Sequence, residues 1–164
     1  MTAGALAVGI GEFRVAKAPE RLGAYGLGSC IVVVLWDPLG SGWGGLAHCM
    51  LPAAPEWERG KTTAKYCDLG IPALHSALAE AVGRPGPFTA RLVGGATMFR
   101  FPDLVRRSPS LGERNAEASR AALEKLGLVP AGEECGGERG RSVEFDPGDG
   151  VVAVRSAPRG LRLM

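Results

Sequence analysis

The sequence is poor in the residues that build metal centres. It contains only two histidines, His48 and His75, and four cysteines. No two cysteines form a C-x-x-C pair, and the histidines lack the spacing of a zinc finger. We therefore expect no metal site.

A strong charge of one sign and a long apolar run are also missing. The 19 basic and 17 acidic side chains leave a net charge of +2, which gives no reason to expect a nucleic-acid partner. No apolar run approaches the roughly 18 residues of a membrane span, and the first ten residues lack the basic segment of a secretory signal. We expect a cytoplasmic protein without membrane insertion, where a reducing environment keeps thiols free.

Internal repeats, low-complexity segments and linkers are absent, so the pattern predicts one domain over residues 1–164. Strands come first, two helices follow, and strands return, which favours an α/β fold: a single-domain sandwich of mixed β-sheet with packed α-helices. Strands are expected at 5–16, 31–36, 44–50, 89–93, 129–135, 143–145 and 151–154. Helices are expected at 64–82, with Pro72 near the start, and at 116–126. A hairpin-like turn is expected at 136–140, and fraying at 157–164.

The strand expected at 31–36 organises the chain. Its β-branched residues show no polar alternation, which indicates burial on both faces. Asp37-Pro38 is turn chemistry, so the chain reverses and brings His48 back beside the strand. Cys30 directly precedes the strand, and 18 positions separate it from His48.

Cys30 and His48 are the minimum for a thiolate nucleophile with its base. A free thiol has a pKa of about 8.5, so we expect His48 to activate Cys30 by forming an imidazolium–thiolate pair with it. Gly28 and Ser29 come just before the cysteine, and the backbone N–H groups around Ser29 and Cys30 are candidates for an oxyanion hole. The alternative for Cys30 is a small buried hydrophobe, as for most free cysteines. Under either reading, the remaining candidates are interpreted as structural: Cys49, Cys67, Cys135 and His75.

Short blocks of the sequence follow one another in a fixed order. The first two are Tyr25-Gly-Leu-Gly-Ser-Cys30 and Gly44-Gly-Leu-Ala-His48-Cys-Met-Leu-Pro52. The later ones are Lys65-Tyr66-Cys67-Asp68 with Ile71-Pro72, Gly94-Gly-Ala-Thr-Met-Phe99, Leu111-Gly-Glu-Arg-Asn115, and a last block made of Gly136-Gly137, Gly140-Arg141 and Val143-Glu-Phe145. In sequence and order these blocks resemble the CheD family. One Gly-Ser-Cys is a weak signal, whereas six ordered blocks over most of the chain are a strong one.

The resemblance implies a glutamine deamidase of methyl-accepting chemotaxis receptors. In that activity Cys30 attacks a glutamine carboxamide, ammonia leaves, and a thioester is hydrolysed to glutamate, with no cofactor. The family also binds a CheC-type chemotaxis phosphatase and raises its activity. The alternative is therefore a weakly active or inactive adaptor that binds and stimulates this phosphatase.

One position departs from the family pattern. The family has a threonine, the third member of a Cys-His-Thr triad, where this chain has Ala24. An alanine accepts no hydrogen bond from an imidazole, so another group must orient His48, and we expect a reduced activity. The candidates are a backbone oxygen or the hydroxyl groups of Tyr25, Ser29, Thr62, Thr63 and Thr97, and the sequence does not choose among them.

Two further patterns were weighed. Gly26-x-Gly28 is a poor nucleotide-binding motif, because the third glycine is missing and a strand rather than a helix follows. The segment 53–63 is predicted to be a loop around Trp57. It is either a lid or recognition element, or an ordinary surface loop with a tucked aromatic ring.

Overall fold

β4 (Ile31–Trp36) is the central strand of this computed structural model, which describes residues 4–98, 108–156 and 160–164. It pairs antiparallel with β5 (Trp43–Cys49) on one side and with β6 (Thr89–Gly94) on the other. Every side chain from Ile31 to Leu35 has an exposed fraction of 0%. The predicted burial on both faces is therefore confirmed.

The strands form two five-stranded sheets. The inner sheet has the order β2-β5-β4-β6-β7, and the outer sheet has the order β1-β3-β8-β9-β10. The pairs β6–β7 and β1–β3 are parallel and the other pairs antiparallel, so both sheets are mixed. Their other strands are β1 (Leu6–Ala7), β2 (Phe13–Lys17), β3 (Leu22–Leu27), β7 (Pro130–Cys135), β8 (Arg141–Phe145), β9 (Val152–Ser156) and β10 (Gly160–Leu163).

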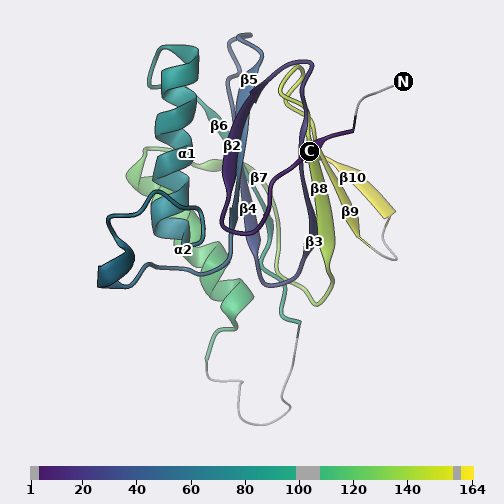
Figure 1. The fold of residues 1–164 in the computed structure, drawn as a ribbon. Coiled ribbons are helices and arrows are strands. Elements are labelled where there is room, and N and C mark those ends of the chain that lie inside the picture. Colours follow the sequence, from purple (N-terminus) through teal and green to yellow (C-terminus); the bar gives the residue numbers. More distant parts are fainter. Residues whose placement is uncertain (1–3, 99–107, 157–159) are drawn as a thin grey trace.

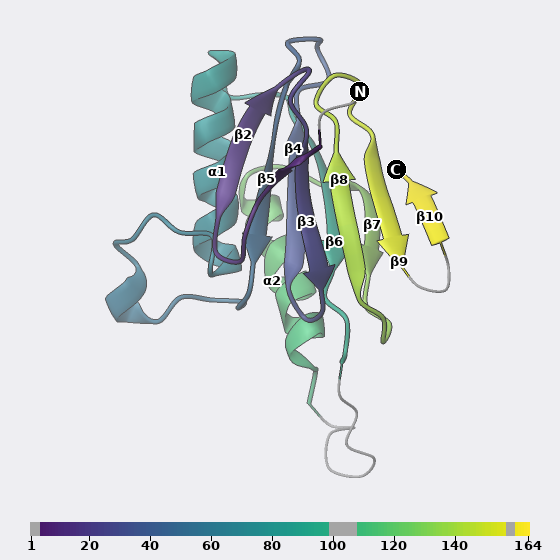
Figure 2. The ribbon, with the colours of Figure 1, turned by 45° about the vertical axis from the view of Figure 1, so that its right-hand side comes forward.

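The molecule has three layers (Figure 1). The inner sheet lies between the outer sheet and a layer of two helices, α1 (Cys67–Val82) and α2 (Leu111–Lys125). The second view shows the outer sheet with its far face free of helices (Figure 2). This arrangement confirms the predicted α/β sandwich. No helix in the described ranges is long and apolar enough to cross a membrane.

Alternate side chains of β4 enter two separate cores. Val32 and Val34 pack against the outer sheet, in a cluster with Phe145. Ile31, Val33 and Leu35 belong to the cluster shared with α1 and α2. A strand with a core on each side has no solvent face, and this explains why its sequence shows no polar alternation.

Two predictions near the N-terminus are wrong. The single strand expected at 5–16 is two short strands, β1 and β2, which lie in different sheets and are joined by a turn. The segment 22–27, where the sequence predicts no strand, is strand β3. Glycine interrupts the strand pattern of this segment. A Cβ at Gly23 would overlap the Tyr25 ring, so the position of that ring requires glycine here.

Both helix boundaries also needed correction. α2 begins at Leu111 instead of Ala116, and the Ser110 side chain caps it by accepting the Glu113 N–H at 3.1 Å. α1 begins at Cys67 rather than at residue 64, and Pro72 lies inside the helix instead of near its start. The sequence pattern overlooked the Ser110 cap at the start of α2. It also overlooked that α1 tolerates an internal proline.

Two predictions near the C-terminus are also wrong. The segment 136–140 is no hairpin, because it connects β7 in the inner sheet to β8 in the outer sheet. Residues 160–163 do not fray but form β10, which pairs with β9. The expectation of fraying at 157–159 lies outside the described residues. Local turn chemistry is the same whether two strands share a sheet or belong to different ones, so the sequence did not separate these cases.

Candidate active site

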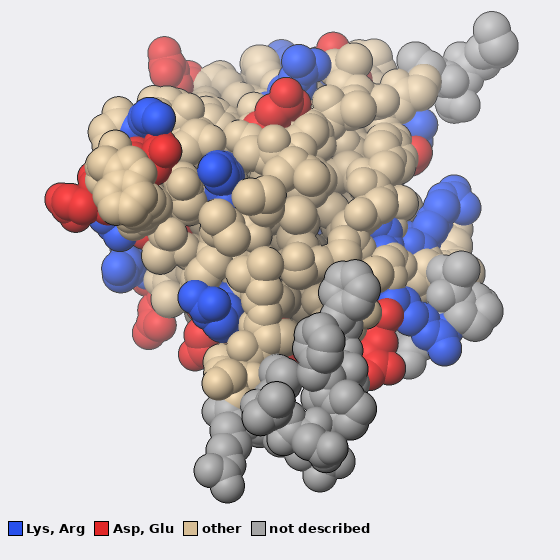
Figure 3. Space-filling model, turned by 60° about the horizontal axis from the view of Figure 1, so that its bottom comes forward, with Lys and Arg blue, Asp and Glu red and all other residues tan. Residues whose placement is uncertain are grey.

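Cys30 lies in the turn that leads from the outer sheet into β4. β3 runs to the lower end of the molecule in Figure 1 and β4 runs back from there, so the turn lies at that end. Figure 3 brings the same end forward and shows charges of both signs around uncharged surface. The Cys30 side chain is partly exposed. Part of the residue therefore lies at the surface of the molecule.

The turn is held through its carbonyl oxygens, which leaves its N–H groups free. Gly95 N–H donates to Cys30 O at 2.8 Å, and Ala96 N–H donates to Gly28 O at 3.0 Å. Within the described residues, the N–H groups of Gly28, Ser29 and Cys30 have no acceptor. Unpaired N–H groups beside a thiol can stabilise an oxyanion, which is the role predicted for this segment.

Gly94 explains why the β4–β6 ladder ends at this point. Its φ is +118°, and a Cβ would overlap the Cys30 carbonyl oxygen. The chain therefore turns away from β4 after Gly94, and the N–H of Cys30 has no strand partner among the described residues. The Arg141 side chain supports this bend by donating to Gly94 O at 3.3 Å and to Gly136 O at 2.6 Å.

His48 lies on β5 and is buried, with an exposed fraction of 4%. It pairs directly with Val32 of β4, two residues beyond Cys30. Since alternate residues share a face, this register brings Cys30 and His48 to neighbouring strands, on the side that packs against the outer sheet. Cys30 contacts the same buried cluster as Val32.

The His48 ring is oriented by a backbone oxygen. Its Nδ1 lies 3.0 Å from Val8 O. Because a carbonyl only accepts, Nδ1 carries the proton, and Nε2 carries the lone pair. Nε2 is buried and has no hydrogen-bond partner among the described residues. The imidazole is therefore held in the tautomer that a general base requires, with its basic nitrogen unoccupied.

Val8 reaches His48 because the chain crosses from one sheet to the other between β1 and β2. His48 N–H donates to Glu12 O at 2.9 Å, and Gly11 N–H donates to His48 O at 2.9 Å. The Glu12 carboxylate closes the turn by accepting the Gly9 N–H at 2.8 Å. The position of the Val8 carbonyl is thus fixed from both sides.

In the described part of the chain, none of the side-chain hydroxyl candidates forms a hydrogen bond with the His48 ring. Tyr25 donates to Glu144, Thr63 donates to Gly11 O, and Thr97 donates to Ser110. Within the described ranges, no bond joins the His48 ring to Ser29 or to Thr62. Ala24 is buried in β3 beside Gly23, whose carbonyl accepts the Val8 N–H at 2.7 Å. Among the alternatives, the structure supports the backbone oxygen.

The pKa directions favour an uncharged pair at rest. Burial raises the pKa of the Cys30 thiol, with a smaller contribution from Cys67. Burial lowers the pKa of His48, although the Val8 carbonyl and the Glu12 charge oppose this. Both shifts have the same cause, because a low dielectric disfavours the charged form of each group. They oppose the imidazolium–thiolate pair in which a catalytic cysteine rests with its histidine protonated.

The remaining cysteines and His75 have structural surroundings. Cys49 and Cys67 are buried in the helix-facing core, and contact with Cys67 together with burial holds the pKa of Cys49 well above its ordinary value. Burial raises the pKa of Cys135 to about 11. His75 packs its ring edge on Phe88. In the part of the chain that the structure describes, no group of metal-ligating side chains is large enough to hold an ion.

Asn115 is a residue that sequence reasoning missed. It lies on α2, is fully buried, and donates from Nδ2 to Ser29 O at 2.8 Å and to Met50 O at 2.9 Å. A signal was available, because Asn115 is a polar residue at the spacing of the buried α2 face, beside Ala116 and one turn before Ser119.

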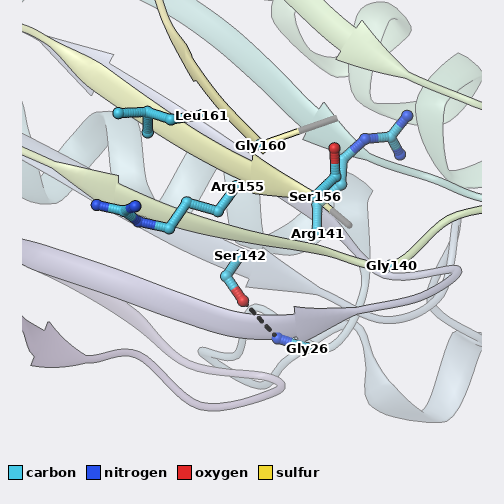
Figure 4. Close-up of a pocket in the computed structure, with 8 residues that line it drawn as sticks. All are labelled: Gly26, Gly140, Arg141, Ser142, Arg155, Ser156, Gly160 and Leu161. Atoms are coloured by element: carbon cyan, nitrogen blue, oxygen red, sulfur yellow. Dashed lines mark hydrogen bonds between the residues drawn. The ribbon is translucent and has the colours of Figure 1, made fainter. Parts of the chain in front are cut away.

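Two surface features lie outside this site. A cavity of 490 Å³ is lined by residues of β8, β9 and β10, including Arg155 and Ser142 (Figure 4). Neither Cys30 nor His48 lines it. Trp57 has an exposed fraction of 81% and lies in the short 3-10 helix Glu56–Glu58, so the interpretation as a tucked aromatic ring is wrong. A lid or recognition role of this loop stays a prediction.

Comparison with known proteins gives consistent matches. Residues 50–156 match the model of the family described as "CheD chemotactic sensory transduction". A "Probable chemoreceptor glutamine deamidase CheD" of Desulforamulus reducens is 38% identical over 96% of this chain and 93% of its own length. The protein of that name from Geobacillus kaustophilus is 38% identical over 98% of both chains. One from Haloarcula marismortui is 38% identical over 92% of this chain and 84% of its own.

Proposed function

Since this chain belongs to the CheD family, we propose that it is a protein-glutamine deamidase that converts glutamines of methyl-accepting chemotaxis receptors to glutamates. The relatives that resemble it over nearly their whole length carry the name chemoreceptor glutamine deamidase. The reaction is the hydrolysis of a side-chain carboxamide, and it needs a nucleophile, a base and an oxyanion site.

In the first half of the reaction, His48 Nε2 takes the thiol proton of Cys30 while Sγ attacks the glutamine Cδ. The carbonyl oxygen becomes an oxyanion, and the free N–H groups of Ser29 and Cys30 are its donors. His48 then returns its proton to the amide nitrogen. The C–N bond breaks, ammonia leaves, and a thioester between Cys30 and the substrate remains.

In the second half, water replaces ammonia in the site. His48 Nε2 takes a proton from the water as its oxygen attacks the thioester carbon. The C–S bond then breaks, the proton returns to Cys30 Sγ, and the product is a glutamate side chain. The balance is one amide and one water in, and one carboxylic acid and one ammonia out, with no electron transfer.

The observation that carries the proposal is the unoccupied, buried Nε2 of His48 on the strand next to Cys30. A buried imidazole nitrogen without a hydrogen-bond partner lowers the stability of the fold. A role as the base that accepts a proton in each cycle explains why this nitrogen is left unpaired. The Val8 carbonyl takes the place of the absent threonine at Nδ1. This supports catalysis in a chain that has Ala24.

The test is mass spectrometry of a purified chemoreceptor cytoplasmic fragment after incubation with the protein. The expected result is a gain of about one mass unit at specific glutamines, as hydrolysis of an amide requires. Cys30→Ala is the control and should give no gain.

Two results would contradict the proposal. One is the absence of conversion on several receptor fragments. The other is equal conversion by wild type and Cys30→Ala, which would reflect spontaneous chemistry or a contaminant. If conversion is absent and a CheC-type phosphatase still binds and is stimulated, the adaptor function is favoured.

A further inference from the structure

The β4–β5 ladder ends beside the candidate nucleophile. Its last pair is Ile31 with Cys49, so the next residues on the two strands, Cys30 and Met50, are no longer paired. The Asn115 side chain lies in this position. Its amide group donates to Ser29 O at 2.8 Å and to Met50 O at 2.9 Å, so one side chain connects the two strand ends.

The identity of the amide atoms at Asn115 follows from these partners. Both partners are backbone carbonyls, which only accept, so Nδ2 must be the atom between them. Both of its N–H groups are then used. Oδ1 is buried and has no partner among the described residues. Asn115 therefore acts here entirely as a double donor.

The bond to Ser29 O determines where the Cys30 N–H points. The carbonyl of Ser29 and the N–H of Cys30 belong to one peptide group, which is planar and trans, so the two bonds point in opposite directions. A donor that holds Ser29 O therefore fixes the direction of the Cys30 N–H. This N–H has no acceptor in the described chain.

The bond to Met50 O anchors the clamp to the strand that carries His48. The N–H groups of Met50 and Leu51 both donate to Lys65 O at 2.9 Å, so the peptide group that carries Met50 O is also held through its N–H. α2 is itself fixed, because a Cβ on Gly112 would overlap the carbonyl oxygens of Gly95 and Ala96. Asn115 thus projects from a rigid helix onto a rigid strand end.

We propose that Asn115 is a positioning residue that holds the Ser29–Cys30 peptide group so that the Cys30 N–H serves as an oxyanion donor. The inference rests on the proposed function for its natural substrate. Asn115 touches no reacting atom in this scheme. Its effect is confined to steps that pass through a tetrahedral oxyanion.

Two small reagents separate this role from a general structural one. p-Nitrophenyl acetate acylates a thiol through a tetrahedral oxyanion, whereas iodoacetamide alkylates it by direct displacement without one. The rates of both reactions at Cys30 are measured on the full chain by mass spectrometry of the Cys30 peptide. Their ratio cancels changes in thiol exposure, in the pKa of Cys30 and in the fraction of folded protein.

In Asn115→Ala, we expect the ratio of acylation to alkylation to fall about 10- to 100-fold. This is less than the roughly 100- to 1,000-fold cost of deleting an oxyanion donor, because the Cys30 N–H is displaced and not removed. Asn115→Asp keeps the side-chain volume but replaces the donor group with an acceptor, and it should show a similar fall. Asp therefore serves as the second variant if Ala does not fold. Ser119→Ala, which also removes a buried polar group from α2, is the matched control and should keep the wild-type ratio.

A ratio within about twofold of wild type in a folded Asn115 variant would overturn the proposal. So would an equal fall in Ser119→Ala, because the effect would then reflect loosening of α2. Neither reagent is a receptor, so the result does not depend on receptor deamidation. A wild type that reacts with both reagents but converts no receptor glutamine would contradict the proposed function alone.

Discussion

The two halves of the candidate pair lie in opposite surroundings. Cys30 lies in a turn at one end of the inner sheet, is partly exposed, and has free N–H groups around it. His48 lies within a strand, is 4% exposed, and has both its ring and its backbone bonded to the crossing segment between β1 and β2. The chain thus exposes part of the candidate nucleophile and buries the candidate base.

This difference follows from what each group has to do. A nucleophile for a macromolecular substrate must be reached from solvent, and an oxyanion site needs N–H groups that no strand has used. A base must keep one tautomer and one ring orientation, which burial and a fixed acceptor at Nδ1 provide. Changes at Cys30 should therefore abolish the reaction, and changes around His48 should weaken it by degrees.

The largest effect is expected at Cys30. Cys30→Ala removes the nucleophile, so the rate of receptor deamidation should fall at least about a thousandfold, to the background rate. The measurement is the mass gain at receptor glutamines over time. Cys135→Ala, at the other partly exposed cysteine, is the matched control and should stay within about twofold of wild type. Residual turnover in Cys30→Ala would remove the cysteine from the mechanism.

Replacing His48 should have the next largest effect. His48→Gln keeps a similar size but removes the base, so kcat should fall about 100- to 10,000-fold. KM should change little, because the ring is buried. His75→Gln is the control at the other histidine, which packs on Phe88, and it should keep the wild-type kcat. A His48→Gln enzyme with wild-type kcat would exclude His48 as the base.

The pH dependence distinguishes the uncharged pair from the ion pair. Burial lowers the pKa of His48 below its ordinary value of 6.5 and raises that of Cys30 above its ordinary value of 9.0. We expect kcat/KM to be independent of pH between the pKa of His48 and the pKa of Cys30. It should fall tenfold per pH unit below the His48 pKa, and it should not fall at alkaline pH until Cys30 ionises. An alkaline fall that follows histidine titration near pH 8 would contradict this and indicate an imidazolium–thiolate pair.

The same His48 shift affects stability. A histidine whose pKa is lower in the folded state binds its proton more readily when unfolded, so its contribution is fully present above about pH 6.5 and is lost as the pH falls toward the folded pKa. Wild type should therefore lose more free energy of unfolding than His48→Gln between pH 7 and pH 5. Urea unfolding at both pH values measures this. Equal losses in the two proteins would contradict the direction of the pKa shift.

A smaller effect is expected at Glu12, which closes the turn that presents Val8. Glu12→Ala removes the bond to Gly9 N–H and one contribution that raises the pKa of His48. We expect kcat to fall about 3- to 10-fold, which corresponds to the net contribution of one ordinary hydrogen bond, because this bond is exposed to solvent. We also expect the pKa of His48 measured by NMR to fall. Glu12→Gln should lower the pKa but recover most of kcat. Glu20→Ala, on the next turn, is the control, and an equal loss there would contradict a specific role of Glu12.

The smallest effect is expected from restoring the threonine of the family pattern. In Ala24→Thr, the new hydroxyl enters a fully buried position, while His48 Nδ1 already has the Val8 carbonyl as its acceptor. We expect less than a threefold change in kcat and a loss of about 1 kcal/mol in the free energy of unfolding. A gain in kcat above tenfold would mean that Val8 does not replace the threonine.

The sequence predicted those parts of the fold that have a one-dimensional signature. β4 could be recognised because five consecutive apolar residues have two cores to fill, and Asp37-Pro38 indicated the reversal that returns His48. β3 was missed because Gly23 and Gly26 interrupt its pattern. The expected strand at 5–16 and the expected hairpin at 136–140 failed for one reason: local sequence does not show when a chain crosses between sheets.

The candidate site was predictable only where side chains define it. Cys30 and His48 stand out by residue type and context. The Val8 carbonyl is a backbone atom 40 positions from His48, and no side chain at Val8 indicates its role. Asn115 lies 86 positions from Ser29. The β1–β2 crossing and the packing of α2 bring these groups together, so only the tertiary structure reveals them.

The most direct test of the account is the protonation state of the His48 ring in the wild-type protein. A two-dimensional ¹⁵N–¹H NMR correlation of ¹⁵N-histidine-labelled protein near pH 7.5 distinguishes the two tautomers and the imidazolium, and His48→Gln assigns the signals. We expect a neutral ring with the proton on Nδ1, held by Val8 O, and a free Nε2. A proton on Nε2, or a doubly protonated ring at that pH, would contradict it.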